Sequence, residues 1–245
     1  MLQTFVVALR EGLEASLIVG ILVAYLVKSG RTHLLRSLWT GVFAAIGLSL
    51  AFGAVLTFTS ASLSKEGEEL FAGVTGIIAV SLVTWMVFWM KRTARFMKLE
   101  LEQKASAAVG AGTLAFAAFT AVAREGLETS LFLYANFKSS NAVASTFGLI
   151  LGLAVAVGLG YGIYRGAIRF NLATFFKVSG VALILVAANV LEYSLHELHE
   201  VGLFFDGNAS IYGAILYVLM ILPAYLAKAK PAKPEELSKK ISLTK

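Results

Sequence analysis

The sequence LREGLEASL at residues 9–17 returns at residues 123–131 as AREGLETSL. Aligning Arg10 with Arg124 pairs seven identical residues among eight. Each copy lies in an otherwise apolar run, and its arginine and two glutamates are the only formal charges between residues 5 and 26 or between residues 105 and 137. Charged side chains at the centre of a bilayer cost about 2.5–3.5 kcal/mol each on insertion scales, so they are functional candidates by default. The duplicated motif is therefore the main feature to be explained.

Composition places the chain among membrane proteins. Of its 245 residues, 58% are hydrophobic and 15% charged, and the mean hydropathy is +0.79, whereas soluble domains have about 25% charged residues. The long apolar runs favour transmembrane helices over the short alternating strands of a barrel. The first run lacks a preceding basic segment, so we expect it to remain as a helix and not to be a signal peptide. The absence of cysteine excludes disulfides and thiolate sites.

Seven stretches are long enough to cross a bilayer, which takes about 20 helical residues. We expect spans near residues 2–27, 34–59, 69–90, 107–136, 143–163, 174–195 and 209–227. The connections alternate between basic and acidic, and basic loops face the cytoplasm. The pattern predicts a multi-pass protein of the cell membrane with its amino terminus outside and a basic cytoplasmic tail over residues 228–245. The net charge of +6 is then explained by the basic cytoplasmic segments that orient the protein in the membrane, and no nucleic-acid partner is expected.

The positions of the two motifs predict an inverted repeat. The motifs fall in the first and fourth spans, which cross the membrane in opposite directions. Spans one to three (about 1–104) and four to six (about 105–208) then form a 3+3 inverted repeat, and the seventh helix (about 209–227) is an addition. Such repeats in transporters meet near the midplane, where substrate sites form. The predicted fold is an all-α polytopic membrane protein with one permease domain over residues 1–227.

Within each motif, the two glutamates share one face of a helix and the arginine lies one turn before the second glutamate. Carboxylates suit hard cations, whereas soft metals prefer sulfur ligands. The methionines of this region (Met86, Met90 and Met97) are expected near the cytoplasmic end, away from the motifs. In the alternative interpretation, the pairs only join helices. The crossing of the two helices would bring together the predicted metal ligands Glu11, Glu14, Glu125 and Glu128 and the charge-compensating residues Arg10 and Arg124.

Glycines indicate where helices approach one another closely. Gly12 and Gly126 remove a side chain between the two glutamates of each motif, so a neighbouring backbone can approach there. The fifth span contains a further series, which is more simply interpreted as helix packing than as a pore: Gly148, Gly152, Gly158 and Gly162.

A second polar group lies at the predicted outer face of the membrane. On a continuing helix, Glu192, His196 and His199 share one face, with Glu200 beside them. This group would collect cations before transport; in the alternative, it is an ordinary solvated interfacial segment. The other acidic outer connection would contribute to the same task through Glu66, Glu68 and Glu69.

The paired Arg-Glu-Gly-Leu-Glu motifs, in the first and fourth of seven spans, resemble those of the iron permease family, and the resemblance covers nearly the whole chain. It implies a transporter, not an enzyme, that imports iron without an organic cofactor. It also implies a ferroxidase or an extracytoplasmic iron-handling protein as partner. By motif match, the transport glutamates would be Glu11, Glu14, Glu125 and Glu128, accompanied by the two arginines. The family has lead-uptake relatives, so a permease for another divalent cation is an alternative.

One further alternative is an intramembrane carboxylate metalloprotein that does not transport. Di-iron bundles also place carboxylates on facing helices, but they use a Glu-x-x-His pair, and neither motif has a histidine three residues after a glutamate. The sequence leaves open whether the ion is Fe(II) or Fe(III), and whether the protein forms a homo-oligomer.

Overall fold

The computed structural model describes residues 1–93, 110–139, 142–165, 171–203 and 208–227. These residues form seven long α-helices and a short 3₁₀ turn, with no strand among them. Each end of a long helix lies within five residues of its predicted position, so the predicted all-α fold with seven spans is confirmed. The elements are α1 (Leu2–Lys28), η1 (Thr32–Leu34), α2 (Leu35–Ser62), α3 (Lys65–Thr93), α5 (Ala111–Ser139), α6 (Ala142–Tyr164), α7 (Leu172–Glu200) and α8 (Ala209–Leu226).

The helices have the length and surface of membrane spans. Among the described residues, five helices are long and apolar enough to cross a bilayer, namely α2, α3, α6, α7 and α8. The outward faces of α2 and α6 carry exposed aromatic side chains such as Phe43, Phe58 and Phe147, which a lipid environment would cover. Helices α1 and α5 are 27 and 29 residues long, but each carries the three charges of its motif. The chain is a polytopic membrane protein, as the composition predicts.

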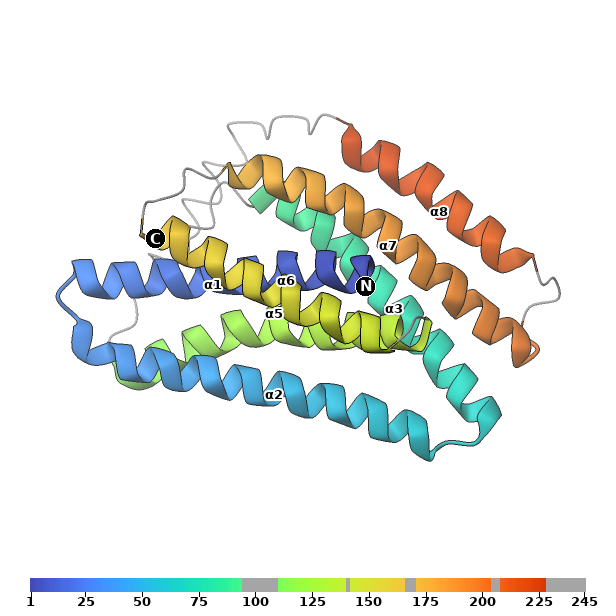
Figure 1. Cartoon of the computed structure of the whole chain (residues 1–245), viewed down its shortest axis with the longest axis horizontal. Coiled ribbons are helices and arrows are strands. Elements are labelled where there is room, and N and C mark those ends of the chain that lie inside the picture. Colours follow the sequence, from blue (N-terminus) through green and yellow to red (C-terminus); the bar gives the residue numbers. More distant parts are fainter. Residues whose placement is uncertain (94–109, 140–141, 166–170, 204–207, 228–245) are drawn as a thin grey trace, which may run out of the picture.

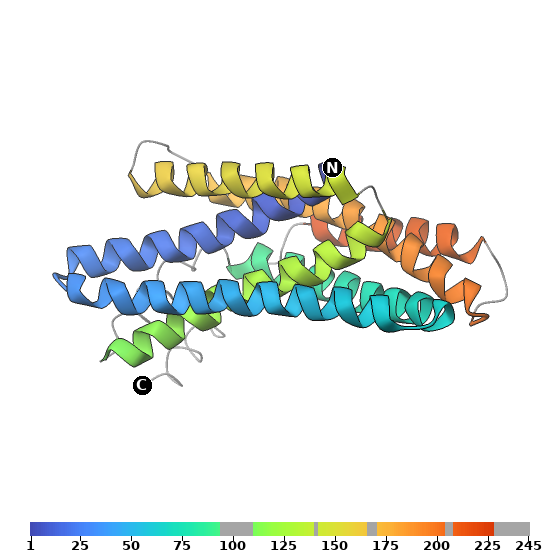
Figure 2. The ribbon, with the colours of Figure 1, turned by 60° about the horizontal axis from the view of Figure 1, so that its bottom comes forward.

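The packing of the helices follows the symmetry expected of an inverted repeat. Helix α1 packs along α6, and its counterpart α5 packs along α2; α3 and α7 pack on each other, as do α1 and α5. Figure 1 shows α1 (blue) and α5 (green) running in opposite directions, and in Figure 2 α2 again lies beside α5. Helix α8 packs on α7, as an added seventh helix would. The exact boundaries of the repeats stay a prediction, since residues 94–109 lie outside the described residues.

Glycines permit the closest of these helix contacts. A Cβ at Gly152 would lie 2.7 Å from Phe5 O and 2.8 Å from Ala8 Cβ on α1, and Gly148 also meets the backbone of α1. A Cβ at Gly41 of α2 would overlap Ala115 O on α5. The packing interpretation thus holds for Gly148 and Gly152, whereas nothing lies within 4 Å of a Cβ at Gly158.

The described connections alternate between two ends of the molecule. The turn from α2 to α3, the end of α7 and the start of α8 lie at one end in Figure 1, and the turn from α1 to α2 lies at the other. This alternation is the one that the loop charges predict. The predicted cytoplasmic tail, residues 228–245, lies outside the described residues, and the orientation of the termini stays a prediction.

Candidate functional site

The motif of α1 forms a buried ion-pair triad. Arg10 Nη1 donates to Glu11 Oε1 at 2.7 Å, and Arg10 Nη2 lies 3.2 Å from Glu14 Oε1. The second contact is at ion-pair distance, but within the described residues Glu14 Oε1 has no partner with hydrogen-bond geometry. The side chains are 1%, 4% and 2% exposed, respectively. Such burial leaves the two carboxylates dependent on one guanidinium group for compensation.

The motif of α5 repeats the sequence but not the environment. Arg124 Nε donates to Glu128 Oε1 at 3.1 Å and lies 3.9 Å from Glu125 Oε1. The Arg124 side chain is 33% exposed, and its Cζ lies 4.4 Å from the ring centroid of Trp89 and 5.9 Å from that of Trp85. Both distances are within cation–π range. Arg124 is therefore shared between a carboxylate and two α3 aromatic rings, whereas Arg10 is enclosed.

Carboxylates from the two motifs meet between α1 and α5. One oxygen each from Glu11, Glu14 and Glu125 lies within 4.8 Å of the others, and all three residues are buried. Two oxygens bound to one transition-metal ion are at most about 4.4 Å apart, because each bond is about 2.0–2.2 Å long. Small side-chain adjustments would thus bring all three onto one cation.

Several oxygens of this group have no hydrogen-bond partner within the described part of the chain. They are Oε2 of Glu11, Oε1 of Glu14, Oε2 of Glu125 and Oε2 of Glu128. Buried polar atoms are rarely left unpaired, and each one calls for an explanation such as an ion. Glu128 is not one of the three carboxylates that cluster, and its Oε1 accepts a hydrogen bond from Arg124 Nε. Arg124 connects Glu128 to the cluster, because its Nε also lies 3.9 Å from Glu125 Oε1.

The motif helices use a second face to dock on their neighbours. A Cβ at Gly12 would lie 2.9 Å from Ala156 on α6, and Ser16, one turn later, packs against Gly160 of the same helix. On α5, Gly126 faces Ser49 of α2, and Ser130 Oγ donates to Ser49 O at 2.8 Å. Small residues four apart permit such close approach. The expected close helix approach at the motif glycines is confirmed. Ser16 and Ser130 also belong to this docking face, which the sequence analysis missed; the sequence feature that could have indicated it is the identical position of the two serines in both copies of the motif.

Met86 lies against the motif of α1, contrary to the prediction. Arg10 Nη1 donates to Met86 Sδ at 2.6 Å, and both side chains are 1% exposed. Residue number fixes how far along α3 the methionine is, but not which face it occupies or how the helices tilt. Met90 also lies beside this motif, in an apolar cluster that contains Leu13 and Phe176. Met97 lies outside the described residues.

The predicted outer group is spread over one end of the molecule. Helix α7 continues to Glu200, and His196 Nε2 lies 3.4 Å from Glu200 Oε1 on the exposed surface. The beginning of α3, which carries Glu66, Glu68 and Glu69, lies near this end of α7 (Figure 1). Glu69 pairs with Lys65 at 3.6 Å. Among the described residues, no group of three metal-binding side chains converges there, so the collecting role stays a prediction.

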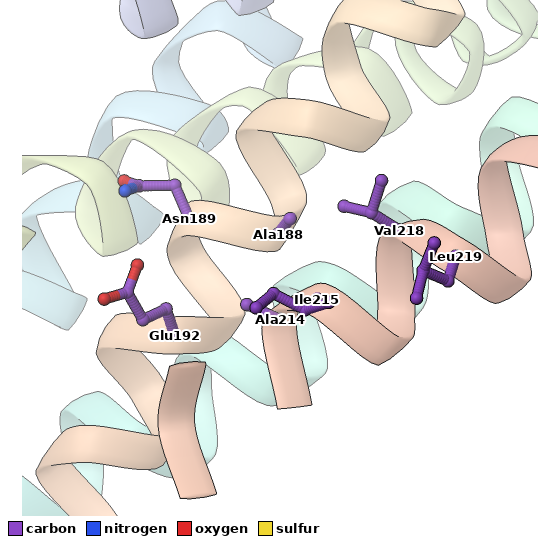
Figure 3. A pocket seen from close by; sticks show the side chains of 7 residues that line it. All are labelled: Ala188, Asn189, Glu192, Ala214, Ile215, Val218 and Leu219. Carbon is purple, nitrogen blue, oxygen red and sulfur yellow. The ribbon is translucent and has the colours of Figure 1, made fainter. Parts of the chain in front are cut away.

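Glu192 lies one turn before His196 on the continuous helix α7. It borders a cavity of about 350 Å³ between α7 and α8, with Asn189 on the preceding turn (Figure 3). The remaining lining is apolar and includes Ile215, Val218 and Leu219 of α8. Gln3 Nε2 of α1 donates to Asn189 Oδ1 at 2.9 Å. The cavity contains none of the motif carboxylates.

The chain is similar in sequence to known permeases. The family model described as "Iron permease FTR1 family" matches residues 1–215. The protein named ferrous iron permease EfeU from Escherichia coli O6:H1 (strain CFT073) is 40% identical over 209 residues, which cover 83% of this chain and 76% of the relative. The protein of the same name from Yersinia pestis is 36% identical over 209 residues, covering 83% and 74%. No solved structure matches significantly.

Proposed function

The chain belongs to the iron permease FTR1 family, and from that premise we propose that it imports iron ions across the cell membrane. The relatives at 36–40% identity are named ferrous iron permeases. The proposed site consists of the four motif carboxylates, Glu11, Glu14, Glu125 and Glu128. The two motif arginines, Arg10 and Arg124, compensate their charge when no ion is bound.

One observation carries the assignment of the site. Glu11 and Glu14 come from α1 and Glu125 comes from α5, yet their oxygens lie within 4.8 Å of one another. Three buried carboxylates repel one another strongly in a medium of low dielectric constant, and the single enclosed guanidinium, Arg10, offsets only part of that charge. A cation bound among them would remove the remaining repulsion, and oxygen ligands of this type suit iron ions and hard cations in general.

The arrangement of the helices suggests a transport cycle. The site lies where the two repeats contact each other, so a rocking motion of one repeat against the other would expose it to each side in turn. We propose that the ion arrives from the acidic end formed by the start of α3 and the end of α7. Arg10 and Arg124 then compete with it for the glutamates, which limits affinity and aids release into the cytoplasm. A ferroxidase or an extracytoplasmic iron-handling protein would supply the ion.

Iron flux into vesicles tests the proposal. The purified protein alone, reconstituted into liposomes that hold a fluorescent iron chelator, should carry added iron inward. Glu125→Gln should abolish the flux while the variant still elutes as a folded protein, because an amide cannot replace an anionic ligand. Thr129→Val is the matched control, since the Thr129 hydroxyl donates to the backbone of its own helix, at 2.7 Å from Glu125 O. That variant should transport at the unmodified rate.

The same vesicles separate the proposal from its alternatives. A carboxylate metalloprotein that does not transport would bind iron but give no flux in any variant. A permease for another divalent cation would carry that cation, for instance lead, faster than iron. Normal iron flux in the double variant Glu14→Gln, Glu125→Gln would refute the site itself.

A further inference from the structure

One nitrogen of the Arg10 guanidinium joins a thioether to a carboxylate. Nη1 donates to Met86 Sδ at 2.6 Å and to Glu11 Oε1 at 2.7 Å. Met86 and Arg10 are each 1% exposed, so solvent does not compete for either atom. A thioether sulfur is only a weak hydrogen-bond acceptor, which makes it an unusual partner for a buried cation with carboxylates from two helices nearby. The sulfur therefore lies beside a position that a cationic group occupies and that Glu11 also contacts.

A metal ion in place of this nitrogen would reach both atoms. Zinc, for comparison, binds thiolate sulfur at about 2.3 Å and carboxylate oxygen at about 2.0–2.2 Å, so an ion between Met86 Sδ and Glu11 Oε1, where Nη1 now lies, would have both atoms as neighbours. We propose that Met86 Sδ is a ligand of the transported ion, which displaces Arg10 Nη1 from its place between the sulfur and Glu11. This inference rests on the proposed function, because it adds one ligand to the same site.

The displaced guanidinium has an alternative position. Its Cζ already lies 6.0 Å from the ring centroid of Phe176 on α7, at the limit of cation–π range. Arg10 Nε has no hydrogen-bond partner within the described residues, so the contacts that hold the group are those of its two terminal nitrogens. A shift toward Phe176, which is 4% exposed, would keep the arginine buried and give it the face of the ring as a partner. The ion and the arginine can thus exchange without unfolding the site.

A sulfur ligand changes which ions the site prefers. Oxygen ligands alone accept hard cations such as Mg²⁺, Ca²⁺ and Mn²⁺, whereas thioethers favour softer ions. Of the two oxidation states of iron, Fe(II) is the softer one. Met86 would therefore make the site discriminate in favour of Fe(II), against both Fe(III) and Mn(II), which the carboxylates by themselves would not achieve.

X-ray absorption at the iron edge tests the ligand directly. The unmodified protein, loaded with Fe(II) under anaerobic conditions, should show one sulfur neighbour in addition to oxygen neighbours. Met86→Leu should lose the sulfur neighbour and keep the oxygens. Met90→Leu is the matched control, because Met90 is also buried on α3, one turn later, and packs among apolar side chains. It should retain the sulfur signal.

Competition in liposomes gives a second measurement. The preference for Fe(II) over Mn(II) should fall by about tenfold or more in Met86→Leu, as is typical when the ligand environment of a metal is altered, and should not change in Met90→Leu. A spectrum of the unmodified protein with oxygen neighbours only would overturn the inference without any variant. An unchanged preference in Met86→Leu would also overturn it. In either case iron flux in the unmodified protein would leave the proposed function standing, whereas absence of flux and binding would remove both.

Discussion

The two motif arginines should differ in their importance for stability, although the sequences of the two motifs around them are nearly identical. Arg10 is 1% exposed and lies 2.7 Å and 3.2 Å from two carboxylates that are themselves 4% and 2% exposed. Arg10→Gln leaves both without their nearest cation. Removing one partner of a buried pair costs about 3–5 kcal/mol of folding free energy, and two stranded carboxylates place this variant at the upper end.

Arg124→Gln should be milder. The Arg124 side chain is 33% exposed and donates a hydrogen bond to one carboxylate, that of Glu128, so the substitution strands one carboxylate and not two. Removing one partner of a buried pair costs about 3–5 kcal/mol, and this variant should lie at the lower end. We expect a loss of about 3 kcal/mol, hence a difference of roughly 2 kcal/mol between the variants by the same principle.

Thermal unfolding of the purified variants in detergent, followed by tryptophan fluorescence, measures this difference. Glu14→Gln in the Arg10→Gln background serves as the control, because it removes one of the stranded charges and should recover part of the loss. Iron should also raise the unfolding temperature of Arg10→Gln more than that of the unmodified protein, since the ion replaces the missing positive charge. Equal destabilisation by the two arginine substitutions would refute the reasoning from burial.

Two further predictions concern packing and topology. Gly41→Ala should lower the free energy of unfolding by about 1–3 kcal/mol, the usual effect of overpacking, because the added Cβ would overlap Ala115 O. Gly47→Ala on the same helix is the control: its Cβ would meet nothing within 4 Å, so it should be neutral or stabilising in the same unfolding assay. Single cysteines introduced into this cysteine-free chain should react with an impermeant reagent from outside at position 65 and only from inside at position 239; reaction at position 239 from outside would contradict the orientation.

The sequence was sufficient for the helices and for the symmetry of their packing. Apolar length set the seven spans, and the motif in opposite-direction spans predicted that α1 and α5 would be equivalent partners. It also predicted that glutamates of both motifs would meet, because the two glutamates of a motif share a helix face. Burial of Glu11, Glu14 and Glu125 together is the arrangement that this reasoning leads to.

Differences between the two copies could not be predicted, because they come from neighbours on other helices. Arg10 and Arg124 have the same local sequence, but Arg10 meets Met86 and Phe176 whereas Arg124 meets Trp85 and Trp89. Which face of α3 points at which motif depends on tilt and rotation, and a nearly uniform apolar helix gives no signal for either.

The most direct test of the central claim is the position of iron in a crystal of the protein, located by anomalous scattering at the iron absorption edge. The account predicts a peak between α1 and α5, within bonding distance of carboxylate oxygens of Glu11, Glu14 and Glu125. A peak found instead at the acidic end near His196 and Glu200, with Arg10 still paired to Glu11 and Glu14 and no iron between them, would contradict it.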